Sequence, residues 1–88
     1  MMEFIYIVLI INNRYVRWEE IAEECSIKDL FFLLKEKYKI EKCIIEIDEL
    51  VINRPSNDKL KHFCFEKKDL TLKIMTKNQN YVLSKNIF

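Results

Sequence analysis

Residues 26–40, SIKDLFFLLKEKYKI, limit the fold more than any other stretch, because they carry the start, the buried face and the end of one helix. Ser26 and Asp29 have the spacing of a capping box, in which each side chain accepts a hydrogen bond from the other residue's backbone N–H. Lysines follow in the last turn, where the helix dipole favours positive charge. The apolar residues recur at helical spacing: Ile27, Leu30, Phe31, Leu34 and Tyr38. We therefore expect a half-buried helix that ends near Lys39.

The composition indicates one ordinary globular domain. The chain has 88 residues, of which 50% are hydrophobic and 33% charged, and its net charge is +1. This balance gives no electrostatic case for extensive contact with nucleic acid or with an anionic membrane. Three cysteines cannot all pair with one another, so we expect reduced thiols in the cytoplasm or nucleus. The apolar run 4–11 is too short to span a membrane and lacks a preceding basic stretch, which favours a buried strand over a signal peptide.

Residues 3–11 and 15–22 predict a β-hairpin that turns at Asn12 and Asn13, since asparagine tolerates positive φ. A two-residue loop would put Ile7 and Leu9 on one face with Val16 and Trp18, and we assign that apolar face to the core. The poor fit of Glu20 to this pattern predicts a bulge or bend near the end of the second strand. The other face then combines apolar and charged side chains: Phe4, Tyr6, Val8, Ile10, Tyr15, Arg17 and Glu19.

The second half of the chain predicts three further strands. Residues 42–47 are rich in β-branched side chains, 50–52 form a short apolar run, and 70–75 alternate in a half-buried pattern. Between them, 53–58 form a loop, and 59–65 form a helical turn or loop buried through large side chains. The predicted class is α+β, with a mixed sheet of four to five strands packed on one helix. The last strand is expected to lie parallel to the first.

This order of elements resembles the ubiquitin-like β-grasp fold over residues 2–76. The residues that carry the resemblance are the helix entry Ser26-Ile27 with Leu30, Leu34 and Ile40, the turn segment 60–65 with Phe63 in place of the family's tyrosine, and Leu70-Thr71-Leu72 of the last strand. We divide the chain into a domain, 1–76, and an apolar tail, 77–88. The family's conjugated members end in a diglycine, whereas this chain contains no glycine. The resemblance therefore implies a fixed protein-binding module rather than a conjugated modifier.

Candidate reactive side chains do not assemble into a recognisable site. His62 and Cys64, with Cys43, provide only one short ligand spacing, whereas a zinc site needs four ligands. The same pair as a nucleophile and base lacks an orienting third residue. We expect no catalytic residue, no metal, no cofactor and no small-molecule substrate. The acidic cluster Glu19, Glu20, Glu23 and Glu24 is interpreted as a solvated edge, with a basic partner as the alternative.

The surplus of apolar side chains predicts a contact surface for a protein in a larger complex. The tail is too apolar for an idle linker, and it either packs on its own domain or meets a partner. The candidate contact residues are Phe4, Tyr6, Val8, Ile10, Tyr15, Lys73, Tyr81, Leu83 and Phe88. A ribosome- or spliceosome-associated factor that also touches RNA through lysines is the alternative. A membrane partner is not expected.

Overall fold

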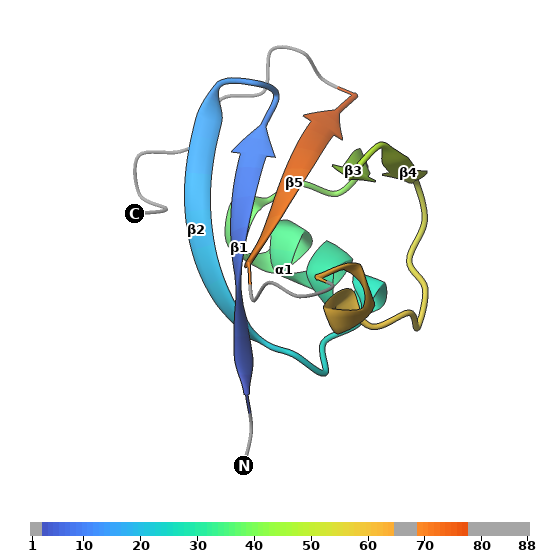
Figure 1. Ribbon diagram of the computed structural model, residues 1–88. Helices are drawn as coiled ribbons and strands as arrows, with labels where there is room; N and C mark the ends of the chain where they lie inside the picture. Colours follow the sequence, from blue (N-terminus) through green and yellow to red (C-terminus); the bar gives the residue numbers. More distant parts are fainter. Residues whose placement is uncertain (1–2, 65–68, 78–88) are drawn as a thin grey trace.

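The computed structural model describes residues 3–64 and 69–77, which form a mixed five-stranded sheet with one α-helix across one face (Figure 1). The strands are β1 (Phe4–Ile11), β2 (Tyr15–Ala22), β3 (Cys43–Ile47), β4 (Leu50–Ile52) and β5 (Asp69–Thr76). The helix is α1 (Ile27–Tyr38), and a 3-10 turn, η1 (Leu60–Phe63), precedes the last strand. The order across the sheet is β2-β1-β5-β3-β4. β1 and β5 are parallel and the other pairs antiparallel, which confirms the predicted pairing of first and last strands.

The helix begins and ends as its sequence predicts. The Asp29 N–H donates to Ser26 Oγ at 3.2 Å, and the Ser26 N–H donates to Asp29 Oδ2 at 2.9 Å. At the other end, Lys39 adopts a left-handed conformation with φ 59°, and its N–H donates to the Leu34 carbonyl. This cap stops the helix without a glycine, at the cost of the strain that a Cβ brings to that region.

The core lies between α1 and one face of the sheet, which we call the inner face. β1 places Ile5, Ile7, Leu9 and Ile11 there, each at most 3% exposed. The remaining buried apolar side chains come from α1, β3, η1, β5 and the adjoining segments: Ile27, Leu30, Leu34, Tyr38, Ile40, Cys43, Ile45, Ile47, Leu60, Cys64, Leu70, Leu72 and Ile74. At ~25 cal/mol per Å² of apolar area, this cluster supplies the main driving force for folding.

The faces predicted for the second strand are wrong, because the hairpin loop is one residue longer than expected. Ile11 pairs with Tyr15, so Arg14 joins Asn12 and Asn13 in the loop. Both asparagines have positive φ, as predicted, at 52° and 58°. A shift of one residue exchanges the two faces of a strand.

The exchange affects every side chain of β2. Tyr15 lies on the inner face, where it packs against the core, and Arg17 and Glu19 share that face. Val16 and Trp18 instead lie on the outer face. Of the bulge or bend predicted near Glu20, the bulge is absent from β2, since the pairing continues unbroken to Phe4 opposite Ala22.

Asn12 joins the hairpin to the far end of β5. Its backbone N–H donates to the Ile74 carbonyl at 2.8 Å. Its side-chain amide donates to Thr76 Oγ1 and accepts from the Thr76 N–H, both at 2.9 Å. These three bonds fix the register of the only parallel pair among the described strands.

Candidate protein-binding surface

Six apolar side chains lie together on the outer face of β1 and β2, and we call this set the β1–β2 patch. The two strands contribute them in register, with Val8 opposite Trp18 and Ile10 opposite Val16. Trp18 is 68% exposed, Tyr6 51%, Val16 50% and Phe4 44%. The members are Phe4, Tyr6, Val8, Ile10, Val16 and Trp18. An aromatic and aliphatic surface of this kind on a small domain is typical of a protein interface.

The four contact residues predicted from the first strand all lie in this patch. Tyr15 does not, because it points to the inner face. Val16 and Trp18 were missed, although Trp18 is the most exposed large apolar side chain described. The predicted residues Tyr81, Leu83 and Phe88 lie outside the described residues, as does the predicted tail from residue 78 onward.

Lys73 interrupts the apolar part of the outer face. It is exposed on β5, opposite Ile10 of β1 on one side and Glu46 of β3 on the other. Beyond it, Ile44 pairs with Met75, and they are 45% and 41% exposed. The outer face thus carries two apolar areas separated by charge, of which the β1–β2 patch is the aromatic one.

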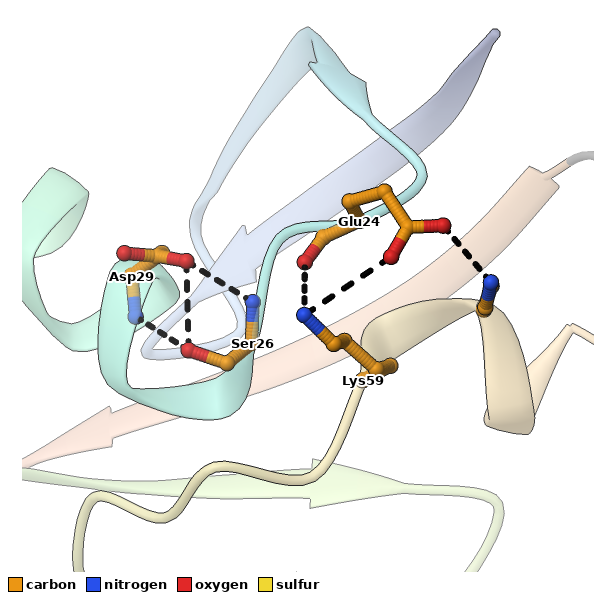
Figure 2. A network of polar contacts seen from close by, with 5 residues as sticks. Glu24, Ser26, Asp29 and Lys59 are labelled. Carbon is orange, nitrogen blue, oxygen red and sulfur yellow. Dashed lines mark hydrogen bonds and ion pairs between the residues drawn. The ribbon is translucent and has the colours of Figure 1, made fainter. Parts of the chain in front are cut away.

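A polar network holds the loop before η1 against the start of α1. Figure 2 shows the Ser26–Asp29 capping box beside Glu24 and Lys59. Lys59 Nζ donates to the Glu24 carbonyl at 3.0 Å, and Lys61 Nζ lies 2.7 Å from Glu24 Oε1. The hydrogen bond and charge of Lys61 lower the pKa of Glu24, and Glu24 raises the pKa of Lys61.

This network also satisfies the first N–H groups of the helix. Ile27 donates to the Asp58 carbonyl and Lys28 to the Ser56 carbonyl, each at 2.9 Å, while Leu30 donates to the Ser26 carbonyl. The backbone bond from Ser26 lowers the pKa of Asp29, which keeps that carboxylate ionised. Because their donors are already bonded, the first turns of α1 hold no N–H ready for a phosphate.

The acidic cluster is partly engaged within the domain. Glu19 Oε1 lies 2.6 Å from Lys37 Nζ of α1, and its side chain is only 10% exposed. Glu24 joins the network just described. These two contacts attach β2 and the segment after it to the rest of the domain, which leaves Glu20 and Glu23 of the cluster for other interactions or solvent.

Two of the three thiols, those of Cys43 and Cys64, are buried, and that of Cys25 is partly buried. Cys64 Sγ donates to the Leu60 carbonyl at 3.6 Å, and burial raises the pKa of its thiol. Burial raises the pKa of Cys43 to about 11, and that of Cys25 is raised mainly for the same reason. Raised pKa values disfavour the thiolate, which is the reactive form. Within residues 3–64 and 69–77, no three His, Cys, Asp or Glu side chains are grouped to hold a metal ion.

Comparison with known families and with curated proteins finds no match for this chain. None of the helices in the described part of the chain has the length and apolar character needed to cross a membrane.

Proposed function

We propose that this chain is a ubiquitin-like β-grasp domain that acts as a protein-binding subunit of a larger complex. The fold assignment is supported by the order hairpin, helix, short strands and final strand, with β5 parallel to β1 at the centre of the sheet. It is supported further by a capped helix on one face only, which leaves the outer face of the sheet for contacts.

The single observation that carries the binding function is the β1–β2 patch. Tryptophan and tyrosine dominate the energetics of protein interfaces, since they bury a large area with little loss of conformational freedom. Trp18 and Tyr6 are both more than half exposed, with Phe4 and Val16 beside them on the same face. Leaving these side chains in water costs free energy that a partner would recover.

The proposed function includes no chemical step and no cofactor. The polar side chains that gather at the start of α1 are bonded to one another and stabilise the domain. The three cysteines are free thiols with raised pKa values, which suits a structural role in a reducing compartment of the cell.

The test compares partners captured by the wild-type chain and by a double variant, Tyr6→Ser with Trp18→Ser, using quantitative mass spectrometry of native extracts. Val51→Ser is the matched control, because Val51 is 60% exposed and lies on β4, outside the patch. A protein that is lost with the double variant and retained with the control supports the proposal. Capture that is the same for all three chains contradicts it.

Trp18 is the only tryptophan, so its fluorescence reports directly on the patch. In the isolated chain we expect red-shifted emission that acrylamide quenches strongly, and a blue shift when a partner binds. Blue-shifted, protected emission in the isolated monomer would mean that the chain covers its own patch, and the contact assignment would fail.

A further inference from the structure

A second apolar surface lies away from the β1–β2 patch, in a groove of about 720 Å³ between α1 and the end of the sheet. One wall is the helix stripe Lys28, Phe31, Phe32 and Lys35, at the i, i+3, i+4, i+7 spacing of one helix face. The other wall is formed by the start of β3 and the end of β5. The volume of the groove falls within the ~300–1,000 Å³ that is usual for ligand pockets.

The groove exists because β4 is too short to cover β3. β4 pairs only with Ile45, Glu46 and Ile47, whereas β3 begins at Cys43. Cys43 and Ile44 therefore pair with β5 on one side and border the groove on the other. The loop after β4 closes one end of the groove with Asn53 and Pro55.

The exposed apolar side chains in the groove need an explanation. Phe32 is 64% exposed although it belongs to the only α-helix described, and Ile44 and Met75 are nearly half exposed. All three line this one groove. The fold buries Leu30, Leu34 and Tyr38 of the same helix almost completely, so packing within the domain does not account for Phe32.

The rim of the groove is basic. Lys28, Lys35, Lys42 and Lys77 line it, against a single acidic residue, Glu41. Three ion pairs among the described residues use other lysines, Lys37, Lys59 and Lys61. Four like charges around an apolar floor attract a segment that carries both acidic and large apolar side chains.

We propose that this groove binds an acidic, apolar peptide segment of a partner protein. The large apolar side chains of the segment fill the space beside Phe32, Ile44 and Met75, and its carboxylates meet the lysines on the rim. This second surface does not depend on the β1–β2 patch, and either assignment can fail alone.

Two other occupants fit the groove less well. A nucleic acid would satisfy the lysines but would leave Phe32, Ile44 and Met75 facing a phosphate backbone. Residues 78–88 of this chain, NQNYVLSKNIF, are apolar enough but contain no aspartate or glutamate, so they do not complement the rim.

The test measures binding of three fluorescein-labelled probes by fluorescence anisotropy. The first is a short synthetic peptide in which leucine and phenylalanine are interspersed with aspartate and glutamate. The second has a lysine in place of each acidic residue, and the third is a single-stranded RNA of mixed sequence. We expect the acidic peptide alone to bind, with an affinity that falls as sodium chloride is added.

Groove variants then locate the site. Lys35→Glu combined with Lys42→Glu is expected to weaken binding of the acidic peptide about tenfold or more. Phe32→Ser tests the apolar floor and is expected to weaken binding of the acidic peptide by about the same factor. Arg14→Glu and Val51→Ser are the matched controls, because they make the same kinds of change at exposed positions outside the groove. Both controls should retain the wild-type affinity.

Several results would overturn the proposal. Equal binding of the acidic and lysine peptides, or preferred binding of the RNA, would exclude an acidic peptide site. Wild-type affinity of the Phe32→Ser variant would show that the acidic peptide binds through surface charge alone. Loss of affinity in the controls, or a shift of Trp18 emission on probe binding, would place the probe elsewhere. Self-association of the free chain that Lys35→Glu with Lys42→Glu abolishes would assign the groove to a second copy.

Discussion

The two faces of the sheet are made from the same strands but are used in opposite ways. β1 alternates Ile5, Ile7, Leu9 and Ile11 on the inner face with Phe4 and Tyr6 on the outer face. All of these side chains are apolar, yet the inner set is covered by α1 while Phe4 and Tyr6 remain about half exposed. The fold thus uses one apolar face for its own stability, and we propose that the other face binds a partner.

This difference shows that hydrophobicity alone does not identify a core. An apolar residue contributes to folding only where another element covers it, and residues 3–64 and 69–77 provide a single α-helix for this purpose. The outer side chains are therefore expected to affect binding much more than stability. The following predictions test that separation.

The largest effect is expected at the centre of the inner face. Leu72 of β5 is fully buried, and Leu72→Ala should lower the free energy of unfolding by about 3 kcal/mol, because it removes buried methyl groups and leaves a cavity. Met75→Ala, on the outer face of the same strand, should cost less than about 1 kcal/mol. Urea denaturation measures both, and equal costs would contradict the assignment of the two faces.

The helix that covers the inner face depends on its cap. Ser26→Ala removes the acceptor for the Asp29 N–H and should cost about 1 kcal/mol of unfolding free energy. Ser26→Thr keeps a hydroxyl and should retain most of that stability. If the Ser26→Ala and Ser26→Thr variants have the same thermal unfolding midpoint, the capping box does not stabilise the helix.

The outer face should tolerate polar substitution. Trp18→Ser is expected to change the free energy of unfolding by no more than about 0.5 kcal/mol, because the indole is mostly in water. Since this variant removes the tryptophan, circular dichroism rather than fluorescence should follow its denaturation. A loss as large as that of Leu72→Ala would show that the β1–β2 patch belongs to the core.

The smallest effect concerns pH. The pKa of Asp29 is lowered in the folded state from its ordinary value of 3.8, chiefly by the Ser26 backbone N–H. The unfolded chain therefore binds this proton first, so the contribution to stability is complete above that value and is lost as pH falls through the folded pKa. In urea denaturation at several pH values, Asp29→Asn should make the free energy of unfolding depend less steeply on pH below 3.8, by a small amount because the carboxylate is exposed.

The sequence was sufficient for the helix and for the existence of β5, because both have local signals, whereas the pairing of β5 with β1 was expected from the order of the elements. Ser26 and Asp29 predict the cap of the helix. The spacing of Leu70, Leu72 and Ile74 at every second position predicts a strand with one apolar face. The faces of β2 were mispredicted because Val16 and Trp18 are the more hydrophobic set, while the actual register depends on Arg14 joining the loop. Sequence hydrophobicity does not encode that choice.

The helix also explains why the faces of β2 were mispredicted. Arg17 and Glu19 are tolerated on the inner face because β2 is at the edge of the sheet, where Lys37 of α1 reaches Glu19. The groove could not be predicted either, since it combines side chains from α1, the start of β3, the loop after β4 and the end of β5. Such a site becomes visible only when the lengths of β3 and β4 are known.

The central position of β5 has a consequence for how the domain is made in the cell. β5 lies between β1 and β3, and without it the hairpin and the β3–β4 pair are two unconnected pieces of sheet. During translation β5 emerges last among these strands, so the growing chain holds its apolar surfaces open until residue 76 has left the ribosome. A domain built in this way can complete its sheet only after β5 is available, because the pairing of β5 joins parts of the chain that are distant in sequence.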